Sequence, residues 1–239
     1  MAIISNKVDY LDGDILLEGF FAFDDAIEGR RPAVLINHPW AGRSPFVEEK
    51  ALKIAELGYF AFAVDMYGKG VLGQNNEECA GLMQPFMDER SLIMSRLNAA
   101  LYAVKLLPWV DDKKIAAIGF CFGGLCVLDL ARAGTDIKGV VSFHGLLGAP
   151  EQNQSSAIKA KVLVLHGHDD PMAPVDHLIA LQEELTQAGA DWQVHSYGNT
   201  LHAFTNPLAN DPDFGTVYKA EADKRSWISM QNFLLEIFA

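Results

Sequence analysis

The segment 119–124 has the sequence Gly-Phe-Cys-Phe-Gly-Gly and carries the thiol best placed for chemistry. It follows the short apolar run 115–118 and precedes a helical pattern that begins near Leu125. A Gly-x-Cys-x-Gly turn between a strand and a helix forces its central residue into a strained conformation above the sheet, and the glycines allow strand and helix to approach closely. We therefore predict that Cys121 is a nucleophile at a helix N-terminus, where the helix dipole stabilises a thiolate.

A thiol nucleophile needs a base, and the base needs an acid that fixes its orientation. In the α/β-hydrolase chain order, the acid follows the nucleophile and the histidine comes last. Asp169 and Asp170 follow the predicted strand 161–166, and from the spacing either carboxylate could be the acid. His202 follows the predicted strand 192–197, which makes it the predicted base.

The transition state of acyl transfer also needs two backbone N–H donors, the oxyanion hole. One should come from Phe122, the residue after the nucleophile, and the other from the loop after the strand that ends before His38. Pro39 has no N–H, so Trp40 is the nearest donor. The Trp40 indole could wall the acyl pocket or simply pack beneath a loop.

Several side chains at predicted strand ends are candidates for contact with a substrate. His38 and His144 each end a strand, and hydrogen bonding behind the site is an equal alternative for both. The predicted substrate-binding set is His38, Trp40, Tyr67 and His144.

Three other interpretations of these residues are weaker. A lone cysteine is usually a small buried hydrophobe, a description that fits Cys126 better than Cys121. A dinucleotide-binding loop would need glycine where Cys121 stands. His166 and His168 lie across a strand end without a matching ligand cluster, so we predict no metal and no cofactor.

The apolar periodicity places these residues on alternating strands and helices, which predicts a mostly parallel sheet covered by helices on both faces, the α/β-hydrolase fold. Gly58, Gly134 and Gly189 stand where helix C-caps belong. The segment 68–85 is the least regular part and is predicted to be a lid or a plain surface connection. The predicted strands are 14–23, 32–37, 59–64, 114–118, 137–143, 161–166 and 192–197, and the predicted helices are 48–57, 88–107, 125–133, 175–188 and 219–238.

Composition narrows the classes of protein and partner. The 239 residues contain no linker-like run, which indicates one domain over 1–239. The formal charge of −12 argues against nucleic acid and anionic membranes as partners. No apolar run has membrane length and the start lacks the features of a signal peptide, while three cysteines suit a reducing compartment. We expect a cytoplasmic protein, a monomer or weak homodimer.

With these residues in place, the chain resembles the dienelactone hydrolase family along nearly its whole length. The resemblance rests on the cysteine turn at 119–124, the segment 64–68 (Val-Asp-Met-Tyr-Gly), the Gly-x-x-Asp-Pro pattern at 167–171 and the motif His-Ala-Phe at 202–204. It implies that the acid is Asp170 rather than Asp169. It also implies a hydrolase of carboxylic esters or lactones that works through an acyl-cysteine.

Two positions depart from the family pattern. Where family enzymes carry a glutamate that hydrogen-bonds the resting thiol, this chain has Pro39, and where they carry an arginine four residues after the histidine, it has Asn206. Arg90 or Arg96 could replace the lost arginine or could form surface salt bridges. Dienelactone itself is therefore in doubt as substrate, and the alternatives are a small-ligand-binding protein without turnover or an acyltransferase.

Overall fold

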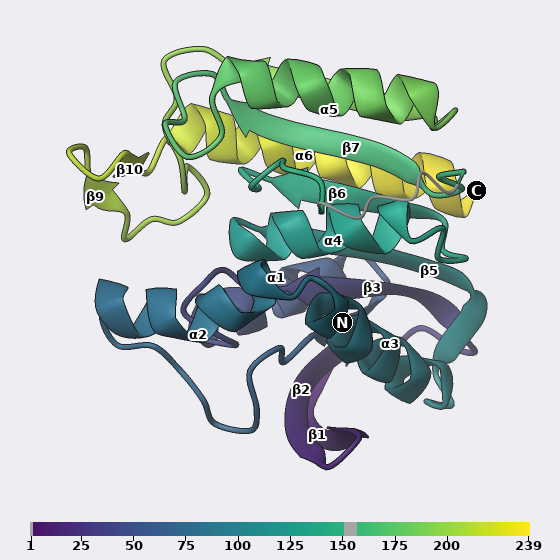
Figure 1. Ribbon diagram of the computed structural model, residues 1–239. Helices are drawn as coiled ribbons and strands as arrows, with labels where there is room; N and C mark the ends of the chain where they lie inside the picture. The colour runs from purple at the N-terminus through teal and green to yellow at the C-terminus, as the bar shows by residue number, and fades with distance from the viewer. Residues whose placement is uncertain (1, 151–156) are drawn as a thin grey trace. The chain divides into compact units, whose positions relative to one another are not determined.

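The computed structural model describes residues 2–150 and 157–239 (Figure 1). Within them, the main sheet has eight strands in the order β1-β2-β4-β3-β5-β6-β7-β8, and β9 and β10 pair separately. The strands are mostly parallel and alternate with helices, so the predicted α/β class is confirmed. The chain forms two compact units, Met1–Ala117 and Ile118–Ala239, and the single domain stays a prediction.

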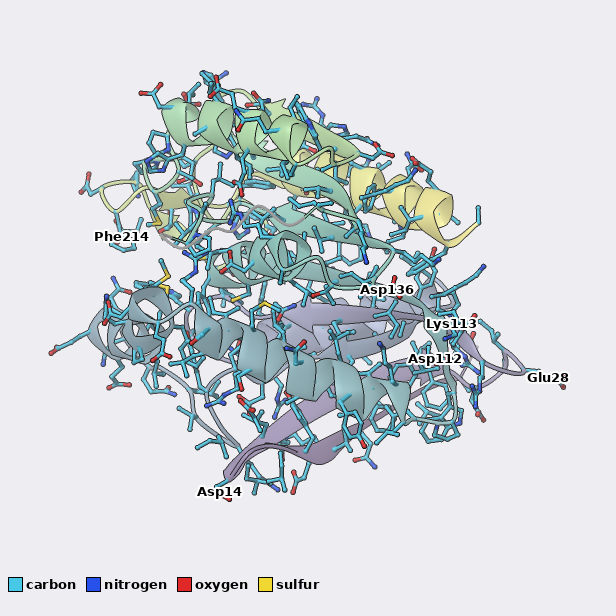
Figure 2. All side chains as sticks on the ribbon, turned by 45° about the vertical axis from the view of Figure 1, so that its right-hand side comes forward. Asp14, Glu28, Asp112, Lys113, Asp136 and Phe214 are labelled. Atoms are coloured by element: carbon cyan, nitrogen blue, oxygen red, sulfur yellow. The ribbon has the colours of Figure 1, made fainter. Side chains whose placement is uncertain are left out.

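Unit 1 begins with a β-hairpin that the sequence did not reveal. β1 (Ile3–Asp12) pairs antiparallel with β2 (Ile15–Asp24) through a turn in which Gly13 has a φ of 57°, and Asp14 lies at the tip (Figure 2). β1 is a strand at the edge of the sheet whose side chains are mostly exposed, so it has no apolar run to detect. β2 pairs antiparallel with β4 (Phe60–Ala63), which is parallel to β3 (Arg31–Asn37).

A stacked aromatic cluster in unit 1 joins three buried phenylalanines to the exposed Trp109. Phe21, Phe23 and Phe60 stack with Trp109, and the ring centroids of these pairs lie 5.0–6.4 Å apart. Aromatic side chains bury large apolar areas, so this cluster is a major source of stability for the strands that carry it. Helix α1 (Pro45–Glu56) contacts the same strands with its buried face.

The prediction for residues 68–107 is wrong in two places. Residues 76–85 do not form an irregular loop, because α2 runs from Asn76 to Asp88, and the next helix, α3 (Ser91–Lys105), starts later than predicted. The Asn75 side chain accepts the N–H of Glu78 at 2.9 Å and caps α2. The polar residues that suggested a loop are thus the first turn of a helix.

The strand β5 (Val110–Phe120) leads from unit 1 into unit 2, where β6 (Gly139–Phe143), β7 (Lys161–Gly167) and β8 (Trp192–Tyr197) are parallel neighbours. The helices of unit 2 are α4 (Phe122–Arg132), α5 (Val175–Gln187) and α6 (Ala220–Phe238) (Figure 1). The short strands β9 (Asn210–Asp211) and β10 (Thr216–Val217) were not predicted. Among the described residues, no helix is both long and apolar enough to cross a membrane.

The predicted helix C-caps are confirmed. Gly58, Gly134 and Gly189 follow the C-terminal residues of α1, α4 and α5, with φ values of 92°, 67° and 68°. A left-handed residue at this place satisfies the last carbonyls of a helix, and glycine adopts it without steric cost. These glycines end three helices of the chain.

A buried ion-pair network joins two helices of unit 2. The guanidinium of Arg132 on α4 lies 3.1 Å from the Asp129 carboxylate and 2.8 Å from that of Glu184 on α5. It also donates to the carbonyl of Leu147 at 2.8 Å, and its side chain is only 3% exposed. Removal of the Arg132 guanidinium should destabilise the fold, because the carboxylates that face it would be left without a positive partner.

We expect Arg132→Met to lower the free energy of unfolding by roughly 3–5 kcal/mol, because it removes the charge facing two carboxylates while keeping much of the side-chain volume. Urea denaturation followed by circular dichroism measures the change. Lys161→Met is the matched control, since its pairs with Asp191 and Glu236 lie at the surface and should be nearly neutral. Equal effects of the two substitutions would contradict the prediction.

Candidate active site

The strand-turn-helix that carries the thiol has the predicted strained geometry. β5 ends at Phe120, α4 begins at Phe122, and Cys121 between them has a φ of 55° and a ψ of −116°. A Cβ added to Gly119 would lie 2.0 Å from the carbonyl oxygen of Gly123, far inside contact distance. The turn can therefore form only with glycine at 119, and it holds its cysteine in a conformation that side chains rarely adopt.

Cys121 differs from the other two cysteines in exposure. Its side chain is half-buried, whereas Cys79 and Cys126 are buried. The N–H of Cys121 donates to the carbonyl of Phe143 at 3.0 Å, which ties the turn to the end of β6. The backbone of Cys121 thus connects the end of β5 to the end of β6. Of the three cysteines, Cys121 is the one that a reagent can reach.

Of the two candidate acids, Asp170 is the one whose carboxylate contacts His202. Its Oδ2 accepts the Nδ1–H of His202 at 2.7 Å, and its Oδ1 accepts the N–H groups of Met172 and Ala173 at 2.8 and 3.3 Å. The carboxylate is buried, and these three donors hold it in one orientation. Asp169 has a different task, because its Oδ2 accepts the N–H of Thr200 at 3.0 Å.

The backbone of His202 is held by the loop that follows it. The N–H of His202 donates to the carbonyl of Gly215 at 3.0 Å, and its carbonyl accepts the N–H of Val217 at 3.1 Å. Gly215 has a φ of 84°, and a Cβ there would lie 2.2 Å from Cγ of Pro171. The loop with β9 and β10 therefore packs against the residue after Asp170 and fixes acid and base together.

The charge of His202 depends on its two acidic neighbours. Burial alone would lower its pKa, but the negative charge of the Cys121 thiolate and the hydrogen bond to Asp170 outweigh burial and raise the pKa to about 10. Nε2 of His202 is buried, and a side-chain hydrogen bond to Cys121 also contributes to the raised pKa. The raised pKa favours the imidazolium form of His202 at neutral pH.

The predicted oxyanion-hole donors lie in different units. Phe122 begins α4 directly after the nucleophile, so its N–H belongs to the first turn of that helix. Trp40 lies in unit 1 after β3, and its carbonyl accepts the hydroxyl of Tyr67 at 3.0 Å. The roles of both N–H groups stay predictions.

His38 is held by the backbone of unit 1. Its Nε2 accepts the N–H of Met66 at 3.2 Å, so the proton is on Nδ1, which donates to the carbonyl of Pro39 at 2.6 Å. Burial lowers the pKa of His38 to about 4, against the opposing effect of the Pro39 carbonyl. The ring of Tyr67 packs against it, with centroids 4.8 Å apart. These contacts favour a hydrogen-bonding role for His38 within unit 1, and substrate binding by either residue stays a prediction.

His144 makes contacts that its sequence position did not reveal. Its Nε2 lies 2.8 Å from Oγ1 of Thr205, and its ring packs edge-on against the ring of His202 with centroids 5.1 Å apart. The sequence did not predict that Thr205 contacts His144, or that the loop carrying Gly215 holds the backbone of His202. The only signal for them was their closeness to His202 in the sequence.

The residues considered for binding an anionic substrate are engaged with protein groups. Oδ1 of Asn206 accepts the N–H of Leu208 at 3.1 Å and closes a turn. The guanidinium of Arg96 pairs with Asp12, and its Nε donates to the carbonyl of Met66 at 3.1 Å. Arg90 directly precedes α3. The salt-bridge alternative is therefore confirmed for Arg96.

His166 lies within β7 and His168 directly follows that strand. Across residues 2–150 and 157–239, no group of three or more His, Cys, Asp or Glu side chains is placed to hold a metal ion. His166 is buried, and burial lowers its pKa, which favours the neutral ring.

Comparison with known proteins extends these observations to the whole chain. Residues 17–238 match the model of the dienelactone hydrolase family. The crystal structure of a dienelactone hydrolase-like promiscuous phosphotriesterase from metagenomic libraries is similar, with a TM-score of 0.94, 37% sequence identity and 100% of both chains covered.

Two further relatives differ in their sequence identity to this chain and in the share of it that they cover. An uncharacterised protein of Caenorhabditis elegans is 39% identical over 155 residues, which are 64% of this chain and 98% of that protein. The carboxymethylenebutenolidase homologue of Mus musculus is 22% identical over 216 residues, 87% of this chain and 86% of that one. The family match covers most of the sequence, and the chain therefore belongs to the dienelactone hydrolase family and is a hydrolase of lactones or esters.

Proposed function

We propose that the chain hydrolyses carboxylic esters or lactones with a Cys121–His202–Asp170 triad through an acyl-cysteine intermediate. The observation that carries the proposal is the 2.7 Å hydrogen bond from His202 to Asp170, because it orients a buried imidazolium whose charge depends on the Cys121 thiolate. A binding protein has no need for a nucleophile, base and acid joined in this way.

In the first half-reaction the Cys121 thiolate attacks the carbonyl carbon and forms a C–S bond. The oxygen gains the negative charge, which the N–H of Phe122 stabilises, with the N–H of Trp40 as the second predicted donor. Nε2 of His202 then gives its proton to the leaving alkoxide as the C–O bond breaks. The products of this half are an acyl-cysteine, a neutral imidazole and an alcohol.

In the second half-reaction the neutral His202 takes a proton from water, and the resulting hydroxide attacks the acyl-cysteine. The C–S bond breaks, the thiolate returns, and the acid leaves. Asp170 stays ionised throughout and stabilises the imidazolium each time it forms. If an alcohol or amine took the place of water, the same groups would perform acyl transfer.

The substrate is expected to be an ester or lactone that needs no arginine clamp of the family type. Asn206 stands at the position of that arginine and uses its side chain to close a turn, and Arg96 is paired with Asp12. We propose a small-molecule substrate, and a cytoplasmic location, since Cys79, Cys121 and Cys126 form no disulfide.

A second candidate activity is the cleavage of phosphotriesters. It is favoured by the 37% identical structure, which is that of a promiscuous phosphotriesterase and covers the whole chain. A thiolate at Cys121 can attack phosphorus, form a P–S bond and release an aryloxide that His202 protonates. Water activated by His202 would then cleave the P–S bond.

Cys121→Ala should lower kcat/KM for a small aryl acetate by at least about 1,000-fold, because members of a triad act as a unit. Rapid mixing of wild-type protein with the ester, followed by intact-mass measurement, should detect an acetyl adduct on Cys121. Cys126→Ala, a change of the same kind five residues away, should keep both turnover and adduct. Full turnover by the Cys121 variant, or no adduct and no product from any ester, would refute the mechanism.

The imidazole of His202 should titrate near pH 10 in the wild-type protein and at lower pH in Cys121→Ala. In the wild-type protein burial lowers the pKa of His202 and the thiolate raises it. The substitution removes the thiolate, so that Asp170 alone opposes the effect of burial. Nitrogen NMR of labelled histidine measures both values. An unchanged titration in the variant would show that the thiolate does not control the charge of His202.

An aryl dialkyl phosphate should give a burst of the aryl alcohol and a phosphoryl adduct on Cys121. The burst is expected because a thiolate displaces a good aryloxide leaving group in the first step, whereas the second step needs attack by water, a weaker nucleophile. Stopped-flow absorbance and intact mass measure the two events. Ester turnover without any burst or adduct from the triester would exclude this second activity alone.

A further inference from the structure

His144 stands directly after β6, next to the residue that holds the nucleophile turn. The carbonyl of Phe143 accepts the N–H of Cys121 at 3.0 Å, and the N–H of His144 donates to the carbonyl of Leu165 at 2.8 Å. His144 has a φ of 38°, a left-handed conformation that is rare for a residue with a bulky side chain. Backbone strain of this kind persists only where surrounding contacts fix it, and it gathers at functional sites.

The side chain of His144 connects this strand end to the loop of the base. The ring is buried, and its Nε2 lies 2.8 Å from the hydroxyl of Thr205, which is also fully buried. Thr205 comes three residues after His202. The side chain of His144 therefore contacts the loop that follows His202, and its backbone adjoins the residue that binds the Cys121 turn.

The ring of His144 also packs directly against the catalytic imidazole. Its centroid lies 5.1 Å from that of His202 at an interplanar angle of 68°, and 5.1 Å from that of Phe204 at 78°. Nδ1 of His202 is held by Asp170, and a weaker side-chain hydrogen bond to Cys121 contributes to the raised pKa of the ring. The direction of Nε2 is thus set by the Asp170 hydrogen bond at one end of the ring and by packing against its faces and edges.

We propose that His144, held by Thr205, is a positioning residue that keeps Nε2 of His202 directed at the Cys121 sulfur. The inference rests on the proposed function, because it gives His144 a task in proton transfer by that triad. The sequence predicted that His144 contacts the substrate directly; we propose instead that His144 acts through His202. The two roles differ in kinetics, since a positioning residue changes kcat and a substrate contact changes KM.

Thr205→Val removes the hydroxyl and keeps the shape of the side chain. We expect kcat for a small aryl ester to fall about 10- to 100-fold with KM changed less than about 2-fold, since a small misalignment of a catalytic group has effects of this size. Thr205→Ser restores the hydroxyl and should recover most of kcat. Ser229→Ala is the matched control, because it breaks the remote 3.0 Å contact of Ser229 with His195 and should change neither constant.

The rate at which iodoacetamide alkylates Cys121, followed by intact mass, tests the same geometry without ester turnover. A thiolate paired with the His202 imidazolium should react at a nearly constant rate from about pH 6 to pH 8, whereas an unpaired thiol reacts faster as the pH rises. We expect the flat profile for wild type and Ser229→Ala, and a rising one for Thr205→Val. His144→Phe, which keeps a planar ring but cannot bond Thr205, should behave like Thr205→Val and serves if that variant does not fold.

The outcomes separate this inference from the proposed function. Wild-type kcat and a flat alkylation profile in both variants, or a raised KM at constant kcat, would overturn the positioning role and leave the triad standing. A wild-type protein with no ester turnover and a rising profile would overturn the triad itself.

Discussion

A positive charge in the interior of a protein requires negative groups around it, and His202 imposes this requirement on the whole site. The imidazolium is buried, so without partners it would lose its proton. Asp170 meets one nitrogen at 2.7 Å, and the Cys121 thiolate raises the pKa from the other side. Because both Asp170 and Cys121 favour that charge, three segments that are distant in sequence must be brought together in unit 2.

Close backbone approach makes that meeting feasible. Gly119 lets β5 turn into α4, and Gly215 lets the loop after His202 pack on Pro171. Gly167 does the same between the acid and the base, since a Cβ there would lie 2.6 Å from the carbonyl oxygen of Thr200. Each glycine stands where two segments of the site touch, so the geometry of the triad is fixed by backbone contacts as much as by its own side chains.

The sequence predicted most of the strands and helices and the residues of the proposed triad, for a physical reason. Buried parallel strands are continuous apolar runs, and catalytic groups follow the ends of such strands in a fixed order. β1 was missed because an edge strand with mostly exposed side chains has no such run, and α2 because its polar first turn looks like a loop.

The contacts of His144 could not be predicted for a different reason. Its partners, Thr205 and the ring of His202, lie about sixty residues away. Neither the left-handed backbone of His144 nor the packing of two rings leaves a periodic pattern in a sequence. Asp170 could be separated from Asp169 only through the family resemblance, and in the structure the two carboxylates face different groups, a ring nitrogen and a backbone N–H.

The backbone of His202 is held by residues that come later in the chain, the carbonyl of Gly215 and the N–H of Val217. A chain leaves the ribosome from its N-terminus, so Cys121 and Asp170 emerge well before these residues. Until position 217 has emerged, the nascent chain lacks the two backbone partners that hold His202 in place. The proposed base therefore reaches its final position only after the proposed nucleophile and acid have been synthesised.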